Sequence, residues 1–338
     1  MWPEGIWRPF GKYSWICLII WIMLIDITKT NFTVYWNVPS HQCHGHGIYL
    51  NASKFGIVQN TDDVFAGDKV NINYRPGRFP YIQDGEPIYG GIPQLADFEN
   101  HTITFANQVE IMPQGYSGLA VLDFEHYLPC YPWAKLEYRQ MSDDYIASLY
   151  PSWSNEEVKA ESEKTFNSSS ADLMEALLKI GTSLRPEALW GYYHYPYCKN
   201  YNALPECQET ILNMNNNSLW IYNSSAAMYP SVYLYKENYD EESRKDMALK
   251  RISESKRLRD LVGKDMPIMV YCWYRYHDVD EYLTDIDLFN TIGLSKLEGV
   301  EGSVIWGSSG DVSSIEKCTA LQLVLILWID AHTLEQGD

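Results

Sequence analysis

The chain has 338 residues, of which 46% are apolar, and this is enough for a single barrel-type domain with a sizeable core. Its 26 basic and 44 acidic residues give a formal charge of −18, which excludes nucleic acid as a partner. Such a charge is typical of a soluble, secreted surface, and we expect a monomer.

The first 30 residues differ from the rest. Arg8 and Lys12 precede an apolar run over residues 15–25. The run is shorter than the about 20 residues that span a bilayer, and it is typical of a signal-peptide core. We therefore predict a signal peptide over residues 1–30, extracellular localisation and no stable membrane insertion. An N-terminal anchor is the alternative.

Cysteines and glycosylation motifs agree with secretion. Removal of Cys17 with the signal leaves six cysteines, an even number that suits an oxidising compartment. Cys198 and Cys207 are close enough in sequence to staple one loop. The Asn-x-Ser/Thr motif, which predicts glycosylation, occurs at Asn31, Asn51, Asn100, Asn167, Asn216 and Asn223.

Short runs of β-branched and aromatic residues alternate with helical patterns along the chain. Continuous apolar runs are typical of parallel strands covered on both faces, and they occur at 32–36, 70–74, 118–125, 188–193, 231–234, 267–271 and 302–306. Helices are predicted from Ser154, where Glu157 completes a capping box, to Leu184, over 241–262, and from about Asp285. The alternation predicts an α/β fold, a distorted (β/α) TIM-like barrel in a single domain over 31–320. Residues 321–338 are expected to form a C-terminal tail or a final helix.

The strongest local motif is Asp123-Phe124-Glu125, at the end of the predicted strand over 118–125. Side chains alternate along a strand, so both carboxyl groups face the same side. In a parallel barrel, this end of the strands carries the active site. Repulsion between neighbouring carboxylates should raise one pKa, and a carboxyl group that stays protonated can act as the acid of a glycosidase.

Aromatic residues recur at or near the same strand ends. The residues are Tyr74, Tyr193, Tyr233, Tyr271 and Trp306. Their rings can pack on sugars, and their polar atoms can orient a substrate. His41, His44 and His46 have no partner group with the spacing of a zinc site, so we expect no metal. The chain also lacks a Gly-rich phosphate loop and a G-x-S-x-G turn, so we expect no cofactor.

With these motifs, the chain resembles the hyaluronidase family of glycoside hydrolases from Tyr35 to Cys318. The landmarks of the resemblance are Tyr35–Pro39, Gly91–Leu95, Asp123–Glu125, Leu184–Pro186, Trp190–Cys198, Tyr229–Leu234 and Val304–Ser309. The resemblance implies retaining, substrate-assisted cleavage of β-1,4 bonds on the reducing side of N-acetylglucosamine. The implied polysaccharide partner is hyaluronan, with chondroitin as a second candidate. Such families use the substrate's acetamido group in place of an enzyme nucleophile.

The resemblance also implies roles for individual residues. Glu125 is the expected proton donor, and Asp123 and Tyr233 are expected to hold the acetamido group. Tyr193 and Trp306 are expected to line its pocket, and Tyr74 and Tyr271 to line the groove. The implied disulfides are Cys43–Cys318 and Cys198–Cys207, which leaves Cys130 and Cys272 as free thiols or as a further pair.

Two features depart from the family pattern. The family usually has Trp-Arg-Pro after the acid, where this chain has Tyr127-Leu128-Pro129. If that arginine holds the strand-end carboxylates, its loss should raise the pKa of Glu125 or Asp123. The chain is also acidic, whereas a hyaluronan groove needs positive potential, for which Arg75, Arg244 and Lys250 are candidates.

Two other functions remain open. A chitinase-like hydrolase would carry a D-x-D-x-E strand, but Val121 occupies the position of its first Asp. A catalytically weak or inactive secreted carbohydrate-binding paralogue would account for Leu128 and for the acidic charge.

Overall fold

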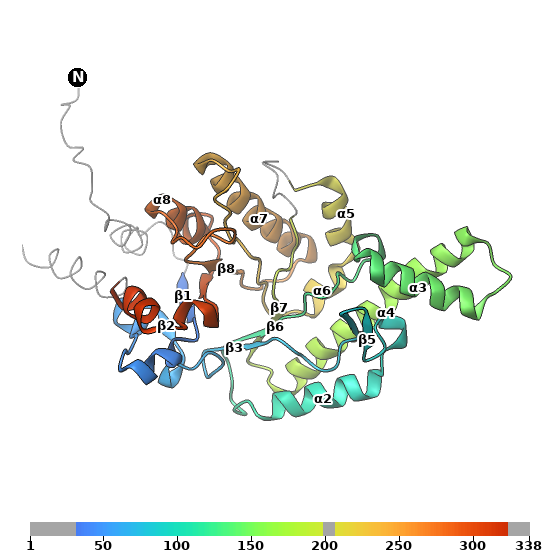
Figure 1. Ribbon diagram of the computed structural model, residues 1–338, viewed down its shortest axis with the longest axis horizontal. Coiled ribbons are helices and arrows are strands. Elements are labelled where there is room, and N and C mark those ends of the chain that lie inside the picture. Colours follow the sequence, from blue (N-terminus) through green and yellow to red (C-terminus); the bar gives the residue numbers. More distant parts are fainter. Residues whose placement is uncertain (1–31, 199–206, 324–338) are drawn as a thin grey trace, which may run out of the picture.

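The computed structural model describes residues 32–198 and 207–323 (Figure 1). The predicted signal peptide, Asn31 and the end of the predicted C-terminal segment lie outside these residues. The strands are β1 (Thr33–Asn37), β2 (Val58–Gln59), β3 (Val70–Asn73), β4 (Tyr81–Gln83), β5 (Glu86–Ile88), β6 (Leu119–Leu122), β7 (Leu189–Tyr192), β8 (Met269–Trp273) and β9 (Gly302–Trp306). The α-helices are α2 (Phe98–Glu110), α3 (Leu136–Leu149), α4 (Asn155–Leu184), α5 (Glu209–Asn217), α6 (Leu219–Ser224), α7 (Glu241–Val262), α8 (Asp285–Leu288) and α9 (Leu294–Leu297).

Parallel strands form the centre of the molecule. One sheet has the order β2-β1-β9-β8, and a second has the order β3-β6-β7. Isolated parallel bridges link β7 to β8: Tyr193 pairs with Tyr229, Met228 with Ile268, and Ser231 with Tyr271. The predicted α/β barrel is thus confirmed, with one correction. The run at 231–234 forms no regular strand. Residues 228–231 lie between β7 and β8 and pair with the residues on either side through single bridges only.

The strands are buried on both faces, which explains their continuous apolar sequences. All four residues of β6, Leu119 to Leu122, are buried. Val121 packs inside the barrel with Val70, Tyr229 and Val304. Leu122 belongs to the larger cluster between the strands and the helices. The barrel interior is therefore a packed core, and only the ends of the strands are free for chemistry.

The helices cover the outside of the barrel (Figure 1). Helix α4 begins with the predicted capping box, in which the Ser154 and Glu157 side chains bond each other's backbone N–H groups. Helix α7 ends at Gly263, whose φ of 66° is the left-handed conformation that favours glycine. The third predicted helix is broken into α8, a π-helical turn over Phe289–Gly293, and α9. Residues 315–323 are helical, so the final helix begins before the predicted start at 321.

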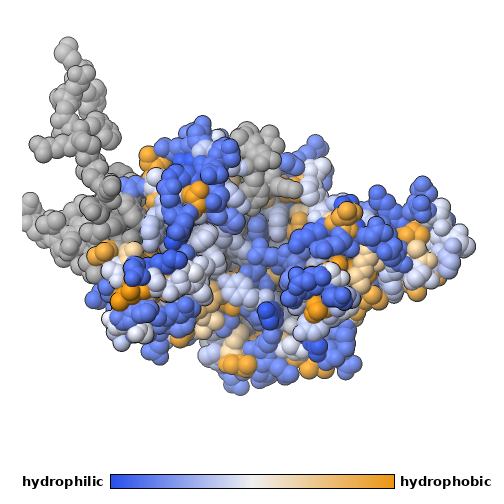
Figure 2. Space-filling model, in the orientation of Figure 1, coloured by the Kyte–Doolittle hydropathy of each residue, from blue (hydrophilic) through white to orange (hydrophobic). Residues whose placement is uncertain are grey.

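The face shown in Figure 2 is mostly hydrophilic, and its apolar residues form small, separate patches. No helix within the described ranges is long and apolar enough to cross a membrane. Among the predicted glycosylation sites, Asn51, Asn100, Asn216 and Asn223 are exposed. Asn167 is half-buried, and its side-chain oxygen accepts a hydrogen bond from the backbone of Tyr131.

Two disulfides tie the structure together. Cys43–Cys318 joins the segment after β1 to the helix over 315–323, across a sequence separation of 275 residues. Cys198–Cys207 closes a loop with a separation of 9 residues after β7. Cys130 and Cys272 are free thiols, the first half-buried and the second buried.

We expect the longer disulfide to contribute more to stability. In the chain-entropy model, replacing Cys43 and Cys318 by serine lowers the free energy of unfolding by roughly 5 kcal/mol. The same change at Cys198 and Cys207 lowers it by about 2–3 kcal/mol, because a shorter loop is released. Denaturant unfolding of the two double variants measures both values. Equal losses would contradict the loop-length argument.

Candidate active site

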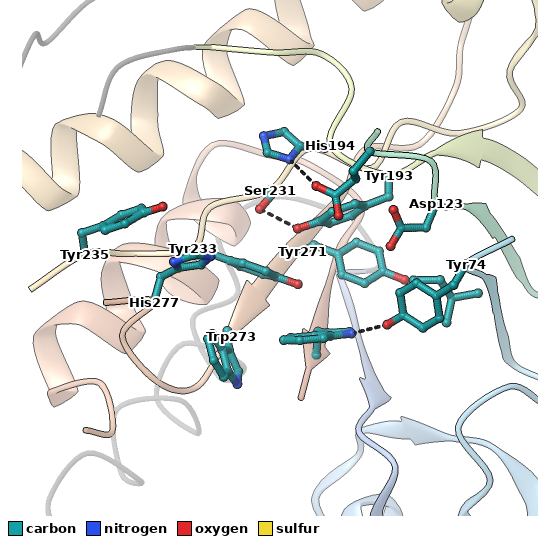
Figure 3. Close-up of a pocket in the computed structure, with 13 residues that line it drawn as sticks. Tyr74, Asp123, Tyr193, His194, Ser231, Tyr233, Tyr235, Tyr271, Trp273 and His277 are labelled. Carbon is teal, nitrogen blue, oxygen red and sulfur yellow. Dashed lines mark hydrogen bonds and ion pairs between the residues drawn. The ribbon is translucent and has the colours of Figure 1, made fainter. Parts of the chain in front are cut away.

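A cavity of about 410 Å³ opens at the carboxyl ends of the central strands (Figure 3). Its walls come from β3, β6, β7, β8 and β9, from the residues that follow these strands, and from residues 231–235, which lie between β7 and β8. The lining residues are Ile72, Tyr74, Asp123, Glu125, Tyr193, His194, Ser231, Tyr233, Tyr235, Tyr271, Trp273, His277 and Trp306. Most of these are aromatic, and Asp123 and Glu125 are its acidic members.

Asp123 and Glu125 directly follow β6 and have contrasting surroundings. The Asp123 residue is buried, whereas the Glu125 side chain is 53% exposed. Burial, then repulsion from Glu125 and the hydrogen bond between the two groups, raises the pKa of Asp123 to about 8. The expected rise in pKa therefore falls on Asp123. Near neutral pH the two carboxyl groups hold one proton, which lies mainly on Asp123.

His194, which follows β7, lies beside Glu125. Its Nδ1 atom is 3.6 Å from Oε2 of Glu125, and it is buried without any other partner. The ring stacks on Tyr197, with centroids 4.3 Å apart and planes 7° apart. The contact with His194 lowers the pKa of Glu125, while burial lowers the pKa of His194 itself. A neutral imidazole thus faces the carboxyl group at neutral pH.

Hydrogen bonds and stacking hold the aromatic walls in place. The Tyr193 hydroxyl donates to Ser231 Oγ at 3.2 Å, and Trp306 Nε1 donates to the Tyr74 hydroxyl at 2.8 Å (Figure 3). The rings of Tyr233 and Trp306 stack with centroids 5.7 Å apart. Burial raises the pKa of Tyr233 well above its ordinary value, so its phenol stays protonated and can donate a hydrogen bond.

The structure brings most of the predicted site residues together in this cavity. These are Tyr74, Asp123, Glu125, Tyr193, Tyr233, Tyr271 and Trp306. Arg244 is not among the lining residues. Its guanidinium is engaged by buried Asp287, at 2.8 Å, and by the Tyr239 carbonyl at 2.6 Å. The expectation that Arg244 helps to bind substrate in this cavity therefore lacks support.

Besides Ile72, which lies within the predicted strand over 70–74, sequence reasoning missed five lining residues. They are His194, Ser231, Tyr235, Trp273 and His277. Each lies at the end of a strand or bridge segment, or within a few residues of it. Extending the search a few residues past every strand end would have found His194 and His277. His44 lies at 3.4 Å from Asp63, and no group of three metal-ligating side chains occurs in the ranges that the structure covers.

Comparison with known proteins identifies the family. A sequence model of the hyaluronidases, a glycoside hydrolase family, matches residues 24–333. The chain belongs to the hyaluronidase family. Hyaluronidase A of Vespula vulgaris is 34% identical over 313 residues, which cover 88% of this chain and 94% of that protein. Hyaluronidase-1 of Rattus norvegicus is 34% identical over 312 residues, which cover 88% of this chain and 69% of that protein.

A solved structure agrees with this assignment. The crystal structure of bee venom hyaluronidase in complex with a hyaluronic acid tetramer matches with a TM-score of 0.81 and 32% identity. The match covers 87% of this chain and 96% of that one. Both the family and the distorted barrel expected from the sequence are therefore confirmed.

The chain departs from the family pattern at Leu128, which is half-buried and packs against the main core. It does not line the cavity, and the basic side chain beside Glu125 is His194. The raised pKa of Asp123 has burial as its main cause. An effect of residue 128 on the carboxyl pair stays a prediction, which Leu128→Arg and a pH–rate profile would test.

Proposed function

We propose that the protein hydrolyses β-1,4 bonds of hyaluronan with retention of configuration, by substrate-assisted catalysis with Glu125 as the proton donor. One observation carries the proposal. An exposed carboxyl group and a buried one are hydrogen-bonded to each other at the strand ends, in an aromatic cavity. Aromatic walls suit the apolar faces of sugar rings, and the carboxyl pair supplies a proton.

The spacing of the carboxyl groups favours a nucleophile from the substrate. In two-carboxylate glycosidases, the groups stand about 5 Å or more apart, on opposite sides of the reacting carbon. Asp123 and Glu125 are hydrogen-bonded to each other, which leaves no room for a sugar carbon between them. The acetamido oxygen of N-acetylglucosamine can take the place of an enzyme nucleophile.

The reaction then has two steps. The acetamido oxygen forms a bond to the anomeric carbon, the bond from that carbon to the leaving oxygen breaks, and the Glu125 proton passes to the leaving oxygen. Water next attacks the same carbon and gives its proton to Glu125, while the acetamido ring opens. Asp123 accepts the amide N–H of the substrate, and the Tyr233 hydroxyl, which lines the same cavity, orients the acetamido group.

Substrate binding places the shared proton where the reaction needs it. A protonated Asp123 accepts an amide N–H poorly, whereas the carboxylate accepts it well. The bound acetamido group therefore favours ionised Asp123 and moves the proton across the hydrogen bond to Glu125. This accounts for a proton donor whose pKa is lowered before substrate binds.

We also propose that the protein acts outside the cell as a monomer. Its two disulfides are typical of an oxidising compartment, and the matching bee protein is a venom enzyme. Chromatography of the protein secreted from expressing cells, with and without residues 1–30, tests both points.

An assay of reducing ends on hyaluronan, chondroitin and chitin oligomers tests the proposed function. We expect hyaluronan to be cleaved, with N-acetylglucosamine at each new reducing end. NMR of the first products should show the β-anomer. The α-anomer would overturn the retaining mechanism. Binding of hyaluronan with no new reducing ends from any polymer would instead favour the inactive carbohydrate-binding paralogue.

His194→Ala is expected to move the upper limb of the pH–rate profile to higher pH. The substitution removes a group that favours ionised Glu125, so Asp123 and Glu125 keep their shared proton to higher pH. The other groups that act on Glu125 or His194, which are Asp123, His277 and Arg251, stay in place.

Two further variants sharpen this prediction. In His194→Asn, the side-chain amide can still donate a hydrogen bond to Glu125, and asparagine tolerates the φ of 70° at this position. The upper limb of its pH–rate profile should therefore lie between those of the wild type and His194→Ala. His46→Ala, at an exposed and distant histidine, should leave the profile unchanged. A loss of kcat in His194→Ala with an unmoved upper limb would show that the residue is only structural.

A further inference from the structure

A second cavity, of about 180 Å³, adjoins the active site. Tyr74 lines both cavities, so its side chain forms a wall that they share. The residues that matter for its chemistry are Tyr74, Arg75, Tyr81, Tyr89, Phe124 and His126. They come from the loop after β3, from the β4–β5 hairpin and its following turn, and from the segment after β6 (Figure 1).

Glu125 stands at the boundary between the two cavities. Along the segment that follows β6, Asp123 and Glu125 line the active-site cavity, whereas Phe124 and His126 line the second one. The sugar that supplies the acetamido group lies beside Asp123. The proton from Glu125 must go to the oxygen of the next sugar, so that sugar is directed toward the second cavity.

The two cavities differ in charge. No lysine or arginine lines the active-site cavity, whereas Arg75 lines the second one. The Arg75 side chain is exposed and has no ion pair within the described ranges. His126 lies close enough that the charges of Lys135 and Arg75, after burial, lower its pKa. Arg78 lies over the ring of Tyr89, 4.3 Å from its centroid, and adds to the positive potential.

The backbone that carries Arg75 is held in place. Gln108 accepts a hydrogen bond from Gly77 N at 2.9 Å and donates one to the Arg75 carbonyl at 2.9 Å. Gly77 has a φ of 62°, and a Cβ there would meet the His101 carbonyl oxygen at 2.8 Å. The loop therefore needs glycine at this position. A fixed backbone lowers the entropy cost of using Arg75 to bind a ligand.

Stacked rings form one wall of this cavity. The rings of Tyr81 and His126 stack with centroids 4.3 Å apart and planes 23° apart. Such a face can pack on the apolar side of a sugar ring. A guanidinium beside it can bind a planar carboxylate through two parallel hydrogen bonds. A ring face and a free guanidinium together fit a uronic acid.

We propose that the second cavity binds the sugar on the leaving-group side of the cleaved bond, and that Arg75 binds the carboxylate of a uronate there. The inference rests on the proposed function, because N-acetylglucosamine is followed by glucuronate in hyaluronan. Arg75 would then be the residue that selects an acidic polymer, because no lysine or arginine lines the active-site cavity.

A comparison of hyaluronan with carboxyl-reduced hyaluronan tests the proposal, because the reduced polymer keeps the linkage and loses the charge. The wild type should have a kcat/KM about tenfold higher on hyaluronan, the effect expected for a charge-assisted hydrogen bond. Arg75→Gln should abolish most of this preference, and Arg75→Lys should keep part of it. Lys159→Gln, at an exposed and distant lysine of α4, removes the same charge and should keep the full preference.

The possible outcomes separate this inference from the proposed function. Cleavage of hyaluronan with an equal preference in the wild type and Arg75→Gln would overturn the role of Arg75 and leave the proposed function standing. No cleavage of either polymer by the wild type would overturn both. Melting temperatures of the variants close to that of the wild type would show that a lost preference is not caused by unfolding.

Discussion

Glu125→Gln should lower kcat on hyaluronan by about 10²–10⁴-fold, the usual contribution of general acid catalysis. Glutamine keeps the shape of the side chain but cannot give a proton to the leaving oxygen. Because the Glu125 side chain is 53% exposed, its replacement should leave the fold intact. Steady-state kinetics and a melting curve of the same preparation measure the two effects.

The control for this variant is Glu110→Gln, at an exposed glutamate at the end of α2. It removes one negative charge far from the cavity and should keep the wild-type rate. Glu125→Gln should still bind hyaluronan, since the aromatic walls and Asp123 are unchanged. A rate near that of the wild type would mean that Glu125 is not the proton donor.

Asp123→Asn should lower kcat by about 10²–10³-fold, as the loss of one group that stabilises the charge of the transition state usually does. The acetamido nitrogen becomes positively charged as its oxygen attacks, and an amide at position 123 cannot balance that charge. KM should change less than kcat, because the charge develops only in the transition state. An unchanged kcat with a raised KM would show that Asp123 only binds substrate.

The same variant should change how stability depends on pH. Asp123 ionises near pH 4 in an unfolded chain but at about pH 8 in the folded protein. Between these values the folded state holds a proton that the unfolded state has lost, so this group lowers stability as pH rises. Asp123→Asn removes that dependence, and its melting temperature should rise relative to the wild type from pH 4 to pH 8. Parallel melting curves would contradict a buried, protonated Asp123.

Sequence periodicity predicted the parts of this fold that depend on local pattern. The apolar run before Asp123 predicted β6, and the alternation of side chains placed Asp123 and Glu125 on one side. Ser154 and Glu157 predicted the start of α4. Such features need only neighbouring residues, so one sequence is enough to find them.

Other features depend on contacts between distant residues. Periodicity predicted a strand at 231–234, but the two flanking strands hold this segment by single bridges only. Arg244 was expected in the groove, but Asp287, which is distant in sequence, holds its guanidinium. The place of His194 beside Glu125 depends on how the end of β7 packs against the segment after β6. A single sequence carries no local signal of these contacts.

The pairing of β1 with β9 has a consequence for the order of folding. Thr33 is paired with Gly302 and Asn37 with Trp306, so the barrel closes through strands that are far apart in the chain. During synthesis, β1 has no β9 partner until residue 306 has left the ribosome. For that time the edges of β1 and β8 stay open to other strands, and Cys43 stays reduced or pairs wrongly. Folding of this protein therefore depends on late, long-range contacts, which form slowly and favour aggregation of the nascent chain.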